Sequence, residues 1–242
     1  NGFTVVLCNT DNNIDTEVYY INKLKDHWID GFILCTATPG SKHLVELRKS
    51  GIPIVLVSRS VGDRIDSVVV DNYKATYNAV TYLINTGHKR IAMACGPRSI
   101  DIYEQRFRGY FDALKDHGIT FSQDAVIYIQ DNNFSFYPMT RYLIRDYNPD
   151  AIVATSDPVA LIVMRAIHDH GLSIPDDISV IGFDNIEQSQ YVEPPLTTIS
   201  QPLYNMGEIA TQKLITMIKN PPLKDPIIDI LPTELIIRKS TR

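Results

Sequence analysis

The sequence predicts an α/β fold of two lobes, each built on a mostly parallel sheet. Short apolar runs typical of strands alternate with helical periodicities from one end of the 242 residues to the other. Such alternation indicates βαβ units with right-handed crossovers. The strand-like runs are too many for a single doubly wound sheet of this length, and no Ser/Gly-rich or charged linker divides the chain. We therefore expect two lobes joined by several tight crossings, an arrangement suited to a hinge around a ligand.

In the first half, the strand-like runs are apolar and rich in β-branched residues. They cover residues 3–8, 31–35, 54–57, 68–70 and 90–95. Between them, apolar residues recur at helical spacing, and Asp15 is the expected cap of the first helix. The apolar positions are Val18, Ile21 and Leu24 in that helix, Leu44 and Leu47 in a short second one, and Tyr73, Tyr77, Val80, Leu83 and Ile84 in a third that stops at Gly87.

The second half repeats the pattern. Strands are expected at residues 126–129, 151–154, 178–183 and 197–199, before a C-terminal segment at 227–238. Asp157 and Pro158 predict a helix start, with Asp157 as the cap and a helix that runs to Gly171. The other helices carry Tyr103, Phe107, Tyr110 and Leu114 before Gly118, Met139, Leu143 and Ile144 before Asn148-Pro149, and Leu203, Met206, Ile209, Ala210, Leu214 and Met217 before Asn220.

Composition and charge exclude several classes of protein. Apolar residues make up 44% of the chain and charged residues 21%, which is ordinary for a soluble protein. The net charge of −5 does not fit a DNA-binding surface, which needs a basic stripe to displace counterions. No apolar run approaches the ~20 residues of a membrane span. Any contact with DNA would come from a segment outside this sequence.

The chain's three cysteines give no disulfide framework and no metal spacing. Cys8, Cys35 and Cys95 each lie inside an apolar strand-like run, so we expect buried free thiols in a reducing cytoplasm. His168 and His170 are two positions apart on a helix and point in different directions, so they cannot share a metal there. We expect no metal and no cofactor.

Polar side chains follow most of the predicted strands. In open α/β sheets, ligands bind beyond the carboxyl ends of the strands. The strand at 178–183 stops on Asp184, and the strand at 197–199 stops on Ser200-Gln201. The other strand ends carry Asn9 and Asp11, Thr36, Ser58-Arg59, Asp71-Asn72, Gly96-Pro97, Gln130-Asp131 and Ser156-Asp157. Carboxylates, amides and arginines can bind the hydroxyls of a polyol, although Asp184 alone could equally be a helix cap and strands often end in polar loops.

Two further residues are candidates for this pocket. Phe134, just past Asp131, could stack on the apolar face of a sugar ring, and the alternative is a core residue at a helix start. Arg106 lies three residues before Gly109 and could donate to a ligand in a fixed fork, and the alternative is a solvated surface arginine.

Several runs in this order resemble the effector-binding core of LacI/GalR-family bacterial transcription regulators. They are Asp30-Gly-Phe-Ile33, Gly51-Ile-Pro-Ile-Val55, Val68-Val-Val-Asp-Asn72, Thr86-Gly-His-Lys-Arg-Ile91, Arg106-Phe-Arg-Gly-Tyr110, the run from Ile174 to Asn185 and the run from Pro194 to Pro202. The resemblance covers essentially the whole chain. It implies a type I periplasmic-binding-protein-like fold of two Rossmann-like lobes with parallel sheets joined by three crossovers.

The same resemblance implies lobe boundaries. Crossings near Asp71, Ser200 and Pro232 divide the chain into an N-terminal lobe of residues 1–71 and 201–231 and a C-terminal lobe of residues 72–200 and 232–242. Family members begin with a helix-turn-helix domain, a hinge and a first strand and helix of the ligand lobe. We expect all of these to precede the residues shown.

The resemblance also assigns effector-binding residues. Arginine and acid at the positions of Arg106 and Asp184 hold ligand polar groups, and the cleft is lined by residues matching Ser58, Val70, Phe134, Ser156 and Leu203 or Gln201. Related sugar-binding proteins often carry Asp-Arg where this chain has Ser58-Arg59, and Asn-Asp where it has Ser156-Asp157. Both departures shorten a polar side chain, so the identity of the sugar does not transfer.

The function implied is the effector-sensing and dimerisation domain of a cytoplasmic repressor that binds a sugar or sugar-like molecule. Its expected partners are the small-molecule effector, a second copy in a homodimer and operator DNA. The contact with DNA would be made only through the absent N-terminal domain, and no contact with a membrane is expected. A phosphocarrier protein on the lobe surface is an alternative partner within the family. The alternative function is an extracytoplasmic sugar-binding protein of a transporter. An enzyme is not expected, since the chain has no GxGxxG, P-loop or GxSxG motif.

Overall fold

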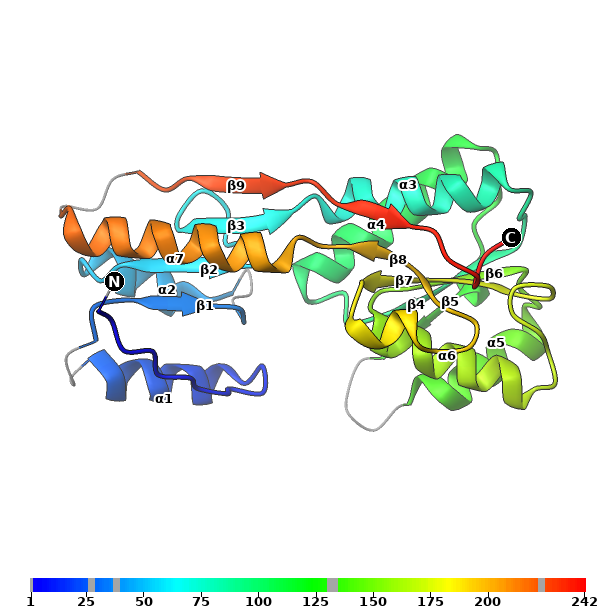
Figure 1. Cartoon of the computed structure of the whole chain (residues 1–242), viewed down its shortest axis with the longest axis horizontal. Helices are drawn as coiled ribbons and strands as arrows, with labels where there is room; N and C mark the ends of the chain where they lie inside the picture. Colours follow the sequence, from blue (N-terminus) through cyan, green and yellow to red (C-terminus); the bar gives the residue numbers. More distant parts are fainter. Residues whose placement is uncertain (1, 26–28, 37–39, 130–134, 222–224) are drawn as a thin grey trace. The chain divides into compact units, whose positions relative to one another are not determined.

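The computed structural model describes residues 2–25, 29–36, 40–129, 135–221 and 225–242. The chain divides into two compact units (Figure 1). Unit 1 contains Asn1–Val69 and Leu203–Leu231, and unit 2 contains Val70–Pro202 and Pro232–Arg242. The chain therefore passes between the units three times. Both units are α/β with predominantly parallel strands, which confirms the predicted fold class.

Unit 1 is built on a sheet with the strand order β1-β2-β3-β9. The strands are β1 (Phe32–Leu34), β2 (Ile54–Val57), β3 (Asp66–Val70) and β9 (Ile228–Leu231). β1 is parallel to β2, and β2 is parallel to β3. All four residues of β2 are buried, as expected for a strand covered on both faces.

The helices of unit 1 are α1 (Ile14–Lys25), α2 (Lys42–Lys49) and α7 (Leu203–Lys219). α1 and α2 contribute Ile21, Leu44 and Leu47 to a core with Ile54 and Leu56 of β2. α7 contacts β1 and β2. An added Cβ at Gly31 would lie 2.9 Å from the Pro53 carbonyl oxygen, so only glycine allows the backbone before β1 to lie this close to the backbone before β2.

The predicted strand at residues 3–8 is wrong. This segment is not a strand, and Val5 and Leu7 are 88% and 95% exposed. An apolar β-branched run becomes a strand only when a neighbouring strand and a packed face receive it, and the part of the chain that the structure describes supplies neither. The buried-thiol expectation is wrong for Cys8, which is half-buried, and for Cys35, which is exposed just beyond the end of β1; it is confirmed for Cys95.

Unit 2 has a larger sheet with the strand order β10-β8-β7-β6-β4-β5. All neighbouring pairs are parallel except β10 with β8, which is antiparallel. The strands are β4 (Ile91–Cys95), β5 (Val126–Tyr128), β6 (Ala151–Ala154), β7 (Ser179–Asp184), β8 (Thr197–Ser200) and β10 (Glu234–Ile236).

The helices of unit 2 cover both faces of this sheet. Met93 and Val153 point into a core with α3 (Asn72–Asn85) and α4 (Asp101–Asp116), whereas their neighbours Ala92 and Ile152 point into a core with α5 (Phe136–Asp146) and α6 (Asp157–Asp169). This alternation follows from the two-residue period of a strand. Short 3-10 turns, η1 (Gln123–Ala125) and η2 (Glu187–Gln190), complete the unit.

The helix ends follow the sequence more closely than the helix starts. Gly87, Gly118 and Gly171 have φ of 97°, 71° and 81° just beyond α3, α4 and α6, which confirms them as stops. The expected caps Asp15 and Asp157 are wrong by one or two positions. Asn13 accepts the backbone N–H of Thr16 instead, and Ser156 is the residue before α6.

Candidate functional site

The carboxyl ends of β7 and β8 bring Asp184 and Gln201 together in unit 2. Asp184 is the last residue of β7 and pairs in register with Ser200, so Gln201 follows on the adjacent strand. Gln201 Nε2 donates to Asp184 Oδ1 at 2.7 Å. Burial raises the pKa of Asp184 above the usual carboxyl value, and the Arg106 charge and the Gln201 hydrogen bond lower it by less.

Arg106 lies in the same unit, on α4, and its side chain is only 3% exposed. Its Nε donates to Asn72 Oδ1 at 2.8 Å, and Nη1 donates to the Thr155 carbonyl. The guanidinium carbon lies 3.4 Å from the centre of the Phe183 ring, next to Asp184 in the sequence. The alternative of a solvated surface arginine is wrong.

A close approach of two helices places Arg106 there. A Cβ on Gly109 would lie 2.3 Å from the Tyr73 carbonyl oxygen, so α4 can pack on α3 at this point only with glycine. Arg106 is one helical turn before Gly109, and the packing brings its side chain to Asn72 at the start of α3. Asp71 caps that helix by accepting the backbone N–H of Lys74 at 2.8 Å.

Other predicted site residues lie near this group or outside the described residues. Ser156 follows Thr155, is partly exposed, and its side chain makes no capping hydrogen bond to α6. Val70 is buried at the end of β3. Phe134 lies outside the described residues, so its predicted stacking role stays a prediction.

Ser58 and Arg59 belong to unit 1, at the carboxyl end of β2. Ser58 has φ of 60°, and its N–H donates to the Val68 carbonyl at 2.9 Å. Although the Cys35 residue is exposed by surface area, the protein atoms around its thiol desolvate it and raise its pKa, and the positive charge of Arg59 lowers that pKa by less. Leu203, the first residue of α7, is 51% exposed.

Sequence reasoning missed a second polar group at the carboxyl end of β1. Glu17 of α1 is 3% exposed, and one of its oxygens lies 2.7 Å from His43 Nε2 of α2. Thr36, after β1, donates to the other oxygen. This pairing joins residues from separate segments, so the sequence carries no local signal for it.

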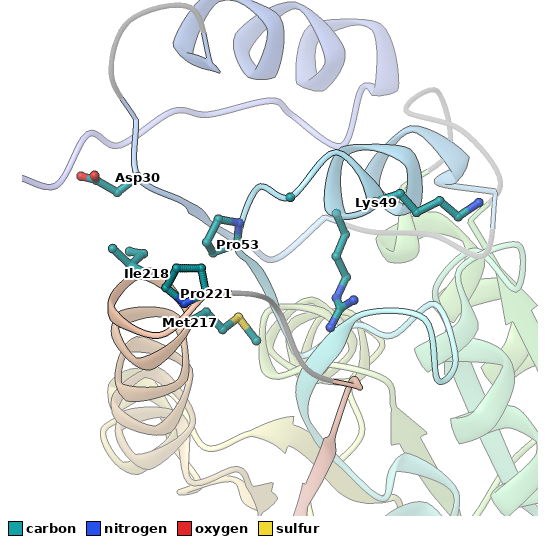
Figure 2. Close-up of a pocket in the computed structure, with 8 residues that line it drawn as sticks. Asp30, Lys49, Pro53, Met217, Ile218 and Pro221 are labelled. Atoms are coloured by element: carbon teal, nitrogen blue, oxygen red, sulfur yellow. The ribbon is translucent and has the colours of Figure 1, made fainter.

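A cavity of about 570 Å³ in unit 1 is not part of the predicted site (Figure 2). It lies between the residues that lead into β1 and β2, among them Asp30 and Pro53, and the end of α7 at Met217 and Ile218. These are the amino ends of the strands, opposite to Ser58 and Arg59. Ligands of parallel sheets bind at the other end.

The group in unit 2 offers a ligand both a cation and an anion on a rigid support. Arg106 supplies a guanidinium, Asp184 a carboxylate and Gln201 an amide, a combination suited to hydroxyl groups. Among the described residues, no cluster of three or more His, Cys, Asp or Glu side chains could hold a metal ion, and no helix is long and apolar enough to span a membrane.

Comparison with known proteins defines the class. The sequence model of the periplasmic binding protein-like domain matches residues 80–241. The chain resembles a LacI-family transcriptional regulator from Enterococcus faecium, solved with bound ribose, with a TM-score of 0.83, 29% identity and coverage of 98% of this chain and 86% of that chain. The protein is therefore a two-unit α/β protein of the periplasmic-binding-protein-like class.

Two curated relatives narrow the class to a family. The chain is 33% identical to catabolite control protein A of Priestia megaterium over 99% of this chain and 73% of the relative. It is 34% identical to the ribose operon repressor of Halalkalibacterium halodurans over 100% of this chain and 71% of the relative. The chain belongs to the LacI/GalR family of transcriptional regulators, and the alternative of a transporter's binding protein is not favoured.

Proposed function

We propose that the chain senses a sugar or sugar-like effector through the group formed by Arg106, Asp184 and Gln201. The observation that supports this most is geometric: the Arg106 guanidinium, in a residue only 3% exposed, lies on the ring of Phe183 next to Asp184, and Asp184 accepts a hydrogen bond from Gln201 at the same sheet edge. The raised pKa of the Asp184 carboxyl agrees with this, because groups with shifted pKa values gather at functional sites. Val70 and Ser156 of the same unit are proposed to complete the site, and Ser58, Arg59 and Phe134 stay predicted effector-binding residues.

A sugar fits this chemistry better than an apolar ligand. The Asp184 carboxylate can accept from ligand hydroxyls, and the Arg106 guanidinium donates in a planar fork. The ribose bound to the Enterococcus faecium regulator supports the same class of ligand. D-ribose is therefore the first compound to test.

Effector binding would act by favouring one arrangement of the two units, which we propose are the N-terminal and C-terminal lobes. Moving an equilibrium from 1:99 to 99:1 requires about 5.5 kcal/mol of differential affinity. A hydrogen bond to a charged group contributes roughly 1.5–3 kcal/mol. A few contacts of this kind suffice.

The remaining functional statements follow from membership of the family. We propose that the protein acts in the cytoplasm as a homodimer, that it contacts operator DNA through an N-terminal domain outside this sequence, and that it has no enzymatic activity. A phosphocarrier protein remains the alternative partner. Sedimentation of the chain at several concentrations would test the dimer.

The experiment that tests effector binding is thermal unfolding with a panel of pentoses, hexoses, disaccharides, their phosphates and nucleobases. A ligand at 100 times its dissociation constant adds about 2.7 kcal/mol to the free energy of unfolding. We expect one sugar class to raise the Tm. Arg106→Lys, which keeps the positive charge but not the planar guanidinium, should lower the affinity for that sugar at least tenfold.

Arg108→Lys is the matched control, because Arg108 lies on the same helix with a side chain that is 71% exposed. It should bind the ligand as the unsubstituted chain does. Equal affinity in the Arg106 and Arg108 variants would remove Arg106 from the site. A panel in which only nucleobases raise the Tm would contradict a sugar effector.

A further inference from the structure

The turn that carries Asp184 has a backbone conformation that residues other than glycine rarely adopt. Asp184 has φ of 116° and Asn185 has φ of 55°. A non-glycine residue in such a region is strained and persists only where its surroundings enforce it. Two consecutive residues of this kind at the proposed effector site require an explanation from their neighbours.

The carboxylate of Asp157 holds the turn from one side. Asp157 is fully buried, at the start of α6. Its Oδ2 accepts the backbone N–H of Ile186 at 2.9 Å and the Ser189 hydroxyl at 2.5 Å, and Oδ1 accepts the Thr198 hydroxyl at 2.6 Å. The carboxylate is so close to β7 that a Cβ on Gly182 would lie 2.1 Å from Oδ1.

Arg238, two residues after β10, holds the turn from the other side. Its Nη2 donates to Asn185 Oδ1 and its Nη1 to the Leu196 carbonyl, both at 2.7 Å. Asn185 is fixed further by its own Nδ2, which donates to Ser200 Oγ at 3.2 Å. One guanidinium thus bridges the turn and the entry to β8, which the single ammonium of a lysine could not do in the same way.

We propose that Asp157 and Arg238 are positioning residues of the effector site, which hold the Asp184–Asn185 turn from two sides and thereby orient the Asp184 carboxylate. The proposal rests on the proposed function for its biological meaning. Arg238 also lies shortly after the chain has crossed from unit 1 into unit 2 at Leu231 and Pro232. One of the three segments that cross between the units therefore continues into the strand and tail that contact the turn.

Two pairs of variants test this in the full chain. Thr198→Val removes the hydroxyl that donates to Asp157 and keeps the side-chain shape, whereas Thr198→Ser keeps the hydroxyl. Arg238→Met removes the guanidinium, and Arg242→Met is its matched control, since Arg242 is exposed and donates to the Asp176 carbonyl at 3.3 Å, away from the turn. The Thr198 pair separates loss of the hydrogen bond to Asp157 from a change in side-chain volume. The arginine pair separates loss of the Arg238 hydrogen bonds from loss of a positive charge near the C-terminus.

The first readout needs no ligand. Hydrogen exchange of the Ile186 amide reports whether its hydrogen bond to Asp157 is kept. The chemical shift of the Asp184 carboxyl carbon, followed against pH, reports the orientation of that side chain through its pKa. In Thr198→Val and Arg238→Met we expect Ile186 to exchange at least tenfold faster, with the amides of β4 and β6 unchanged. The pKa of Asp184 should fall toward its ordinary value, because burial is the main cause that raises it.

The second readout is calorimetric titration with D-ribose. D-ribose should bind Thr198→Val and Arg238→Met at least tenfold more weakly than it binds the unsubstituted chain. Its affinity for Thr198→Ser and Arg242→Met should equal that for the unsubstituted chain. If D-ribose binds none of the five proteins, ribose is contradicted as the effector while the Asp184 titration still decides the positioning role. The proposal would be overturned if the pKa of Asp184 and the exchange rate of the Ile186 amide in Thr198→Val and Arg238→Met both equalled those of the unsubstituted chain. If Thr198→Val fails to fold, the measurement on Arg238→Met decides alone.

Discussion

Arg106 combines two kinds of contact in one guanidinium. It donates to Asn72 and to the Thr155 carbonyl within the fold, and it stacks on Phe183 beside the proposed ligand site. Removal of the whole side chain, as in Arg106→Ala, would therefore lose internal hydrogen bonds together with ligand contacts. Variants that keep the stem and the charge are the ones that report on binding.

At Asp184 the structure predicts opposite effects on binding and on stability. Because the pKa of Asp184 is raised in the folded state, the stability that its proton contributes is present at acidic pH and lost as the pH rises through the raised value. Asp184→Asn cannot ionise. We expect the variant to have a higher free energy of unfolding than the unsubstituted chain at pH 7, an equal one below the ordinary carboxyl range, and effector affinity about 10- to 100-fold weaker.

Urea unfolding at a series of pH values measures this, with Asp176→Asn as the control at an exposed carboxylate. A lower free energy of unfolding for Asp184→Asn than for the unsubstituted chain at pH 7 would reverse the sign and show that Asp184 is stabilised as an anion in the folded protein.

At the scale of single elements, β9 of unit 1 depends on a buried carboxylate. Asp66, at the start of β3, accepts the backbone N–H of Ile227 just before β9 at 3.0 Å. It also lies 3.3 Å from Arg48 Nη2 of α2 and 3.6 Å from Lys213 Nζ of α7. Asp66 is 4% exposed, so within the part of the chain that the structure describes its charge is compensated by these partners and not by solvent.

Asp66→Asn should therefore lower the free energy of unfolding by about 2 kcal/mol, since it removes a buried negative charge from beside Arg48 and Lys213, although Lys213 keeps Asp229 at 2.8 Å. Asp63→Asn, an exposed position in the preceding loop, is the matched control. Denaturant unfolding measures both. Equal midpoints for the two variants would mean that the charges around Asp66 are satisfied by solvent.

At the scale of the whole molecule, the two units differ in how much core they bury. Unit 2 has packed cores on both faces of its six-stranded sheet, whereas the core cluster of unit 1 lies on one face of four strands. In unit 1, α7 buries only Met206 and Ala210. Fewer buried apolar groups mean a lower free energy of local opening.

Hydrogen exchange should consequently detect faster exchange of the amides of β2 and β3 than of β4, β6 and β7, although all are central strands. Effector binding should slow exchange at the Asp184 turn. Identical protection in both sheets would show that the units unfold as one cooperative body, and the thermal transition would then be two-state.

The fold class and most helices and strands could be predicted from the order of residues alone. The strands at Ile54–Val57 and Ala151–Ala154 have the predicted bounds, because a buried parallel strand is one uninterrupted apolar run. The glycines that end helices could also be predicted from the local sequence, because a left-handed residue after a helix needs no partner from a distant segment. The candidates Asp184 and Gln201 were found from their place after strands, and the resemblance to a family supported Arg106.

Only the tertiary structure decided what depends on residues far apart in the chain. The apolar run at residues 3–8 is no strand, because pairing is a property of neighbours and not of the run itself. Asp157, expected to cap α6, is a buried acceptor for Thr198 and Ile186. The carboxylates of Glu17 and Asp157 and the guanidinium of Arg238 have partners that no sequence period connects, since hydrogen bonds between segments are set by packing alone.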